Sequence, residues 1–303
     1  MADNAMHITN GKNVSTITEI LSLVRVQQWY KNLVVFLAIF FSGNMLQGSF
    51  WLPSLLAFLS LSFMSSAGYI LNDLRDLPQD RLHPEKKKRA LASGTVGKPF
   101  AIVLFLAFLT LSLALALFIN NPSGNISFII FPISLFFLSL LYSFVLKNIV
   151  FADILAIASL FTLRAVSGAY AINVYVSPWL LLCPFFLALF LAAGKRHADV
   201  LLLHDKAGAT RETLYHYTPT ITKSLITIST TAAILCYALY SLLSGHQYLW
   251  YTLPFALFVM LRYYHLIITG SEIARHPEKL LKDQQLVIGI LLWVLVTLGM
   301  LYW

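Results

Sequence analysis

The chain has 303 residues, of which 58% are hydrophobic and 11% are charged. Soluble domains carry about 25% charged residues, so this composition excludes an ordinary soluble protein and indicates a polytopic membrane protein. The formal net charge of +8 does not indicate nucleic-acid binding, because the basic residues gather in connections on one side of the predicted spans. Both cysteines, Cys183 and Cys236, lie inside apolar runs and indicate no disulfide framework.

Residues 1–15 are predicted to be a flexible cytosolic N-terminus, because they are mostly polar and contain no early apolar run. Apolar runs of about 20 residues, the length that crosses a bilayer as an α-helix, recur along the rest of the chain. The fold class is therefore all-α: a single transmembrane domain over 1–303, with cytosolic cap loops. We predict nine transmembrane helices at about 30–50, 53–74, 99–119, 126–146, 150–172, 178–195, 219–243, 248–268 and 286–303.

The orientation in the membrane follows from the distribution of basic residues. Neither Lys nor Arg occurs in the connections near 42–52, 120–126, 172–178 and 244–250. Basic residues of multi-pass proteins concentrate on the cytosolic side. We therefore predict that the N-terminus and the polar loops at 75–98 and 195–218 are cytosolic, and that the C-terminus lies outside.

Three aspartates, Asp73, Asp76 and Asp80, follow the second predicted span. Their spacing places them on one face of a helix, although Pro78 can break that helix and turn Asp80 away. Neighbouring carboxylates repel unless a cation lies between them, and Mg²⁺ commonly joins carboxylates to substrate phosphates. The aspartates therefore predict a site for Mg²⁺, with Mn²⁺ as a substitute. The alternative is a solvated loop whose mixed charges have no ligand.

Charged residues also interrupt the fifth predicted span. Arg164 lies about three turns inside it, where an arginine costs at least ~2.5 kcal/mol on insertion scales. Arg164 should therefore have an anionic partner, either Asp153 or a bound phosphate. Lys147 and Asp153 lie at the ends of spans, where long side chains can reach the interface.

Five stretches resemble the UbiA superfamily of intramembrane prenyltransferases and, within it, the decaprenyl-phosphate phosphoribosyltransferase branch. These stretches lie in the first two thirds of the chain. The last three predicted spans support the resemblance only through their apolar character. They are Gln28–Asn32, Asn72–Asp80 with His83-Pro84 and Ala92-Ser93-Gly94, Tyr142-Ser143 with Lys147, Arg164–Ala169, and Ala193–Arg196.

The resemblance implies a UbiA-type bundle in the plasma (inner) membrane. It implies transfer of 5-phosphoribose from phosphoribosyl diphosphate (PRPP) to a polyprenyl phosphate with release of diphosphate, for lipid-linked arabinose and cell-wall polysaccharide synthesis. The residues that it implies for catalysis are Asp73, Asp76, Arg164 and Lys195. The residues that it implies for substrate binding are Gln28, Lys31, Asn32, Asn72, Arg81, Lys87, Arg89, Tyr142, Lys147, Arg196 and Asp199.

Two other functions are left open, and so is a homo-oligomeric state. An aromatic-acceptor prenyltransferase of the same superfamily, using a polyprenyl diphosphate, would share the first aspartate motif. Its second loop commonly carries another Asp-x-x-x-Asp, whereas here Asp199 is followed four positions later by Leu203. A transporter would need charges along a path to both faces, yet the outer half of the predicted spans has no acidic or basic residue apart from the deep Arg164.

Overall fold

The computed structural model describes residues 17–84, 86–119, 128–203 and 212–302, and all regular secondary structure in these ranges is helical. Residues 17–24 form a first short helix. The α-helices are α2 (Leu37–Phe41), α3 (Trp51–Arg75), α4 (Leu77–Leu82), α5 (Lys98–Phe118), α6 (Ile130–Phe144), α7 (Ala152–Ala171), α8 (Pro178–Leu203), α10 (Pro219–Leu243), α11 (Leu253–Ile268), α12 (Glu272–Arg275) and α13 (Gln284–Tyr302). The 3₁₀ helices are η1 (Val26–Phe36), η2 (Gly48–Phe50), η3 (Lys86–Lys88), η4 (Leu146–Asn148), η6 (Glu212–His216), η7 (Leu249–Thr252) and η8 (Pro277–Lys282).

Eight helical segments in the described ranges are long and apolar enough to cross a membrane. They correspond to the second to ninth predicted spans, so the prediction of an all-α multi-pass protein is confirmed. The predicted sixth span, 178–195, continues as α8 to Leu203. That extension carries the polar residues after Gly194 on a rigid helix instead of a loop.

The first predicted span, 30–50, differs from the structure. The chain here forms η1, with 11 residues, and α2, with five, and then turns before η2. A 3₁₀ helix rises about 2.0 Å per residue, so η1 and α2 together reach about 30 Å, close to the thickness of the bilayer core. The segment runs antiparallel to α3, because Trp29 Nε1 donates to Ser66 Oγ at 3.0 Å and the Phe36 ring lies 6.2 Å from that of Trp51.

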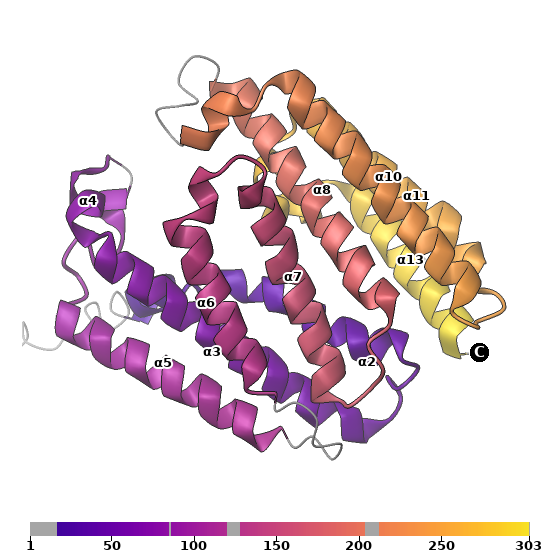
Figure 1. The fold of residues 1–303 in the computed structure, drawn as a ribbon, viewed down its shortest axis with the longest axis horizontal. Coiled ribbons are helices and arrows are strands. Elements are labelled where there is room, and N and C mark those ends of the chain that lie inside the picture. Colours follow the sequence, from indigo (N-terminus) through magenta and orange to yellow (C-terminus); the bar gives the residue numbers. More distant parts are fainter. Residues whose placement is uncertain (1–16, 85, 120–127, 204–211, 303) are drawn as a thin grey trace, which may run out of the picture.

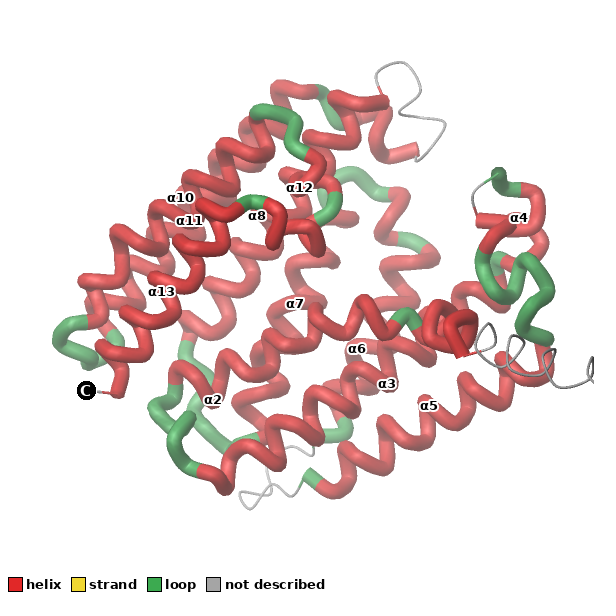
Figure 2. The backbone as a smooth tube through the Cα atoms, turned by 180° about the vertical axis from the view of Figure 1, so that it is seen from behind, coloured by secondary structure: helices red, strands yellow, loops and turns green. Residues whose placement is uncertain are grey.

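Figures 1 and 2 show the helices packed as one bundle, with α4 and the C-terminus on opposite sides. The Tyr302 hydroxyl donates to the Phe40 carbonyl at 3.0 Å and accepts from the Met45 N–H at 3.0 Å. The end of α13 therefore lies beside the end of the first crossing. Counted with that crossing, nine segments of the described chain cross the bundle, which places α4 and the C-terminus on opposite sides of it.

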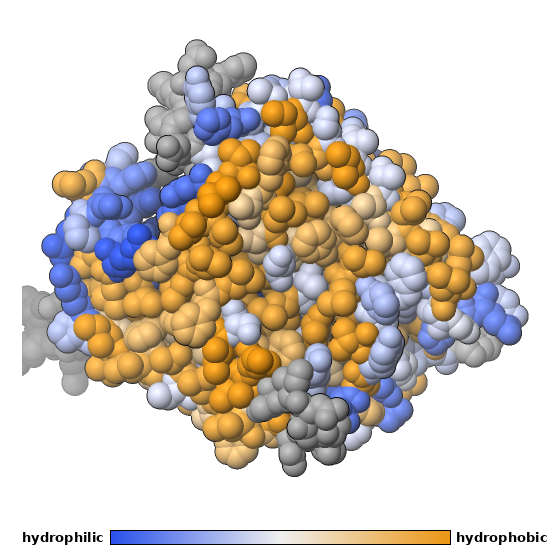
Figure 3. All heavy atoms as spheres, in the orientation of Figure 1, coloured by the Kyte–Doolittle hydropathy of each residue, from blue (hydrophilic) through white to orange (hydrophobic). Residues whose placement is uncertain are grey.

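The outer surface of the bundle suits a lipid environment. Leu117 and Phe118 of α5 are 68% and 76% exposed. Most of the face in Figure 3 is hydrophobic, and hydrophilic side chains gather over α4. In the interior, a Cβ atom added to Gly168 of α7 would lie only 2.0 Å from the Val35 carbonyl oxygen. Glycine at this position allows the first crossing to approach α7 closely.

Candidate active site

A polar stripe on α3 faces the first crossing. Ser62, Ser66, Tyr69 and Asp73 follow one another at steps of four, three and four residues, which aligns them on one helix face. Ser62 Oγ accepts from Asn32 Nδ2 at 3.0 Å. The guanidinium carbon of Arg25 lies 4.8 Å from the centre of the Tyr69 ring. These serines and Tyr69 were not among the predicted site residues, although their spacing relative to Asp73 is visible in the sequence.

Asp73 and Asp80 come together because the helix breaks between them. Helix α3 ends at Arg75 and α4 begins at Leu77, with Pro78 in its first turn, where a missing N–H costs no helical hydrogen bond. Arg89 Nη1 lies 3.1 Å from Asp73 Oδ1 and 2.7 Å from Asp80 Oδ2. One guanidinium nitrogen therefore bridges two buried carboxylates.

Asp76 lies at the break itself and does not join the other two carboxylates. Its side chain is a third exposed, and its Oδ1 lies 3.8 Å from Arg75 Nε. The predicted common face of three aspartates is therefore absent, because Pro78 interrupts the helix that the spacing assumed. The structure brings Asp73 and Asp80 together and leaves Asp76 beside them, open to solvent.

Further cations surround the two buried carboxylates. Arg25 Nη2 lies 2.7 Å from Asp73 Oδ1, and Lys86 Nζ lies 3.8 Å from Asp80 Oδ1. With Arg89, three cationic side chains face two carboxylates, and this carboxylate cluster of Arg25, Asp73, Asp80, Lys86 and Arg89 has a net positive charge. Such a charge favours phosphate-bearing ligands.

The carboxylates have the chemistry that Mg²⁺ prefers. Mg²⁺ takes oxygen ligands, usually one or two carboxylates together with water and substrate phosphates. In the part of the chain that the structure describes, no three His, Cys, Asp or Glu side chains surround one point. Asp73 and Asp80 fit the common arrangement, in which the protein supplies two carboxylates and the ligand supplies phosphate oxygens.

Arg164 is buried and has no carboxylate partner among the ion pairs of the described residues. Its Nε donates to Asn32 Oδ1 at 2.7 Å, and its Nη1 donates to the Leu160 carbonyl at 2.8 Å. Asp153, one of its two predicted partners, pairs with Arg196 instead. Neutral oxygens therefore hold the Arg164 guanidinium, and its positive charge is not cancelled by an acidic side chain.

A second ionic cluster joins α7, α8 and α12. Arg196 Nε donates to Asp153 Oδ2 at 2.8 Å, and Asp199 Oδ1 lies 3.0 Å from Arg275 Nε. The Tyr217 hydroxyl donates to Asp153 Oδ1 at 2.6 Å. Burial and the contact with Asp153 raise the pKa of Tyr217, so the phenol stays protonated at neutral pH. Arg196 and Asp199, both predicted to bind substrate, are thus engaged in ion pairs within the protein.

The other predicted residues surround these groups. Asn72 Nδ2 donates to Ser143 Oγ at 3.2 Å and so links α3 to α6. Lys31 lies 5.9 Å from the Tyr30 ring centre. The exposed residues of the set are Arg81, Lys87 and Lys195, and the half-buried ones are Gln28, Tyr142 and Lys147.

An apolar cavity of about 370 Å³ lies between the first crossing, α7, α8, α10, α11 and α13. Phe161 lines it, and the Phe161 ring centre is 5.5 Å from the guanidinium carbon of Arg164. Leu191 also lines it, one helical turn before Lys195. Tyr237 and Trp293 line it as well, joined by a hydrogen bond of 2.9 Å. The Arg164 guanidinium therefore lies next to the wall of the cavity, and aromatic side chains form other parts of that wall.

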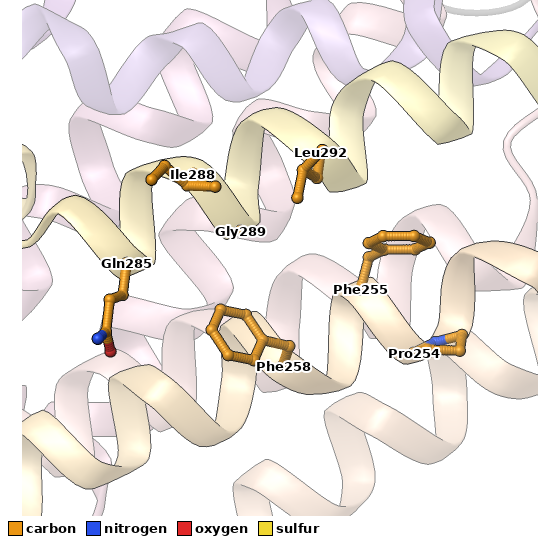
Figure 4. Close-up of a pocket in the computed structure, with 7 residues that line it drawn as sticks. All are labelled: Pro254, Phe255, Phe258, Gln285, Ile288, Gly289 and Leu292. Atoms are coloured by element: carbon orange, nitrogen blue, oxygen red, sulfur yellow. The ribbon is translucent and has the colours of Figure 1, made fainter.

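A separate open groove of about 580 Å³ is lined only by α11 and α13. Figure 4 shows Phe255 and Phe258 of α11 pointing toward α13, where Phe258 packs so closely against Gly289 that an added Cβ atom would lie 2.8 Å from the Phe258 ring. None of the predicted site residues lines this groove, so it is not part of the candidate active site.

The bundle defines a multi-pass membrane protein with buried carboxylates, Asp73 and Asp80, and a buried arginine, Arg164, at the wall of an apolar cavity. Residues 32–282 match the UbiA prenyltransferase family, and the chain belongs to that family. The predicted family is therefore confirmed.

Similar proteins carry more specific names. The chain is 34% identical over 284 residues to a decaprenyl-phosphate phosphoribosyltransferase from Corynebacterium glutamicum, covering 90% of this chain and 84% of that protein. It is 30% identical to one from Mycobacterium tuberculosis, covering 92% of each. A UbiA homolog from Archaeoglobus fulgidus, solved with DMAPP and Mg²⁺, has a TM-score of 0.70 at 21% identity, covering 93% of this chain and 98% of that one. That likeness confirms the predicted UbiA-type fold.

Proposed function

We propose that the protein transfers 5-phosphoribose from PRPP to a polyprenyl phosphate of the decaprenyl type and releases diphosphate. Relatives that align over about nine tenths of the chain bear the name of this activity. The structural observation that carries the proposal is the pairing of two features in one bundle: the cationic carboxylate cluster at Asp73 and Asp80, and a buried cation, Arg164, at the wall of an apolar cavity. A soluble diphosphate and a lipid phosphate need these two environments.

Asp73 and Asp80 would hold Mg²⁺, or Mn²⁺, with Asp76 within reach at the helix break. The metal, when bound, supplies positive charge to the leaving diphosphate. Arg25 and Arg89 add guanidinium donors, which suit phosphate oxygens. We assign the exposed Arg81 and Lys87 to the ribose 5-phosphate.

The lipid phosphate needs no activation by a protein nucleophile. One of its oxygen atoms is already anionic and forms a bond to ribose C1, while the bond from C1 to the diphosphate oxygen breaks. The work of the protein is to hold the two substrates in line and to stabilise charge. We assign Arg164 and Lys195 to the lipid phosphate, because Arg164 has no carboxylate partner and both residues lie close to lining residues of the apolar cavity.

The polar face of α3 supports placing both substrates in one site. The Tyr69 ring on this face lies under the guanidinium of Arg25, which belongs to the carboxylate cluster. Asn32 donates to Ser62 Oγ on the same face and accepts from Arg164 Nε. We therefore place the ribose and the lipid phosphate along this one face of α3.

We further propose that the site faces the cytosol from the plasma (inner) membrane. The basic connections lie on the same side of the bundle as α4, and basic residues mark the cytosolic side. The product would be a lipid-linked phosphoribose that supplies lipid-linked arabinose for cell-wall polysaccharide. Its polyprenyl tail would stay in the membrane, partly in the apolar cavity.

The test compares two substrate pairs with the purified protein and Mg²⁺. One reaction contains ribose-labelled PRPP and decaprenyl phosphate, and the other contains a polyprenyl diphosphate and a labelled aromatic acceptor such as 4-hydroxybenzoate. The proposal predicts label in the lipid phase only in the first reaction, and no label with Asp73→Asn. Product from the second pair alone would instead identify an aromatic-acceptor prenyltransferase.

A further inference from the structure

Arg89 occupies a distinctive position in the carboxylate cluster. Its Nη1 atom contacts Asp73 Oδ1 and Asp80 Oδ2, at 3.1 and 2.7 Å. The side chains of Asp73 and Asp80 are only 6% and 3% exposed. Two buried carboxylates this close require a cation between them, because neither is hydrated well enough to tolerate the other. Arg89 supplies that cation in the protein alone.

The same space is the one that a bridging metal ion needs. Both carboxylate oxygens point at one nitrogen atom, so a divalent ion bound to both would overlap with Arg89 Nη1. Of the two arginines in the cluster, Arg89 is the better placed to leave. It belongs to the connection between η3 and α5 and is 34% exposed, whereas the Arg25 guanidinium stacks on the Tyr69 ring.

We propose that Arg89 is an exchangeable counter-ion: it holds Asp73 and Asp80 together in the empty site, leaves them when a divalent cation binds, and then donates to a phosphate oxygen of the bound diphosphate ligand. The identity of that ligand rests on the proposed function. Throughout the exchange the two carboxylates stay buried, and a cation next to them always balances their negative charge. It also makes metal and substrate binding interdependent, because the side chain that the metal releases becomes a ligand for the phosphate.

The test measures Mn²⁺ binding to the detergent-solubilised full chain without substrate, by the electron paramagnetic resonance signal of free Mn²⁺. The variants are Arg89→Gln and, as the matched control, Lys88→Gln, which removes the same charge from the exposed neighbouring residue. Because Arg89 competes with the metal, Arg89→Gln should lower the dissociation constant for Mn²⁺ at least about fivefold relative to Lys88→Gln. Inorganic diphosphate, added with saturating Mn²⁺, should bind more weakly to Arg89→Gln than to the control.

Equal or weaker Mn²⁺ binding by Arg89→Gln relative to Lys88→Gln would overturn the exchange. Tighter Mn²⁺ binding with unchanged diphosphate binding would overturn the second step, the transfer to phosphate. If Arg89→Gln does not fold, Arg89→Lys replaces it. A single ammonium group cannot reproduce the planar fork of a guanidinium, so Arg89→Lys should lower the dissociation constant for Mn²⁺ as well, but by a smaller factor. These measurements involve no lipid substrate, so their failure is distinguishable from a failure of phosphoribosyl transfer.

Discussion

Arg164 Nε donates to the side-chain oxygen of Asn32 at 2.7 Å, across 132 residues of sequence. Asn32 belongs to the first crossing and Arg164 to α7, so this hydrogen bond fixes the buried guanidinium at the contact between them. It also leaves Arg164 without an acidic partner. An arginine held by neutral oxygens keeps its charge for a ligand, whereas Arg196, paired with Asp153, does not.

Replacing these two arginines should therefore lower the free energy of unfolding by different amounts. Arg164→Gln leaves no buried carboxylate unpaired, so the free energy of unfolding should fall by only about 1 to 3 kcal/mol, while phosphoribosyl transfer is lost. Arg196→Gln leaves Asp153 buried without its cation, so the fall should be about 3 to 5 kcal/mol. Chemical unfolding of the ligand-free variants measures both values. A larger loss for Arg164→Gln than for Arg196→Gln would refute the assignment of Arg164 to a ligand.

Tyr217 is predicted to stabilise the start of α7. Its hydroxyl accepts the Phe151 N–H at 3.0 Å and donates to Asp153, and Phe151 has a φ of +65°, a conformation that a phenylalanine rarely adopts. Tyr217→Phe removes both hydrogen bonds and should lower the free energy of unfolding by about 1 to 3 kcal/mol. Tyr215→Phe is the control, because Tyr215 is 79% exposed. Equal unfolding midpoints for the two variants would count against this role.

Asp283 is predicted to make stability depend on pH in acid. Two hydrogen bonds from Arg262, at 3.2 and 2.7 Å, hold the pKa of Asp283 below its ordinary value. A lowered folded-state pKa contributes stability above the unfolded pKa of about 3.9, and that contribution is lost as pH falls through the folded pKa. The unfolding midpoint of the wild type should therefore exceed that of Asp283→Asn at pH 7, and the two should converge as the pH falls through the lowered folded-state pKa of Asp283. A difference that is independent of pH would contradict the prediction.

The orientation can be checked with single cysteines in a chain whose two native cysteines are replaced. Gln79 is exposed on α4, and Gln247 is exposed in the connection that lacks basic residues. In intact cells, a membrane-impermeant maleimide should label Gln247→Cys and leave Gln79→Cys unlabelled. Labelling of Gln79→Cys from outside would reverse the assigned topology.

Hydropathy predicted eight of the crossings, because apolar length is a local property of the chain. It misplaced the first one, because residue counting assumes the rise of an α-helix, whereas η1 covers more distance per residue.

The spacing of Asp73, Asp76 and Asp80 indicated a shared site, but only the break at Pro78 decided which two of them meet.

The site residues that the sequence did not predict, Arg25 and Arg275, were missed for the same reason. Arg25 contacts Asp73 across 48 residues, and Arg275 contacts Asp199 across 76. Nothing in the local pattern around either arginine distinguishes it from a solvated basic residue near a membrane. Tyr69 could have been identified, since it lies one helical turn before Asp73 on the same face.

The most direct test of the central claim follows two labels of PRPP in one reaction with decaprenyl phosphate and Mg²⁺. One label is in the ribose and the other in the β-phosphate. Transfer of phosphoribose predicts that the ribose label enters the lipid phase while the β-phosphate label is released to water as diphosphate, in equal amounts, and that Asp73→Asn does neither. Ribose label that remains in water, or β-phosphate label that enters the lipid, would contradict the proposed reaction.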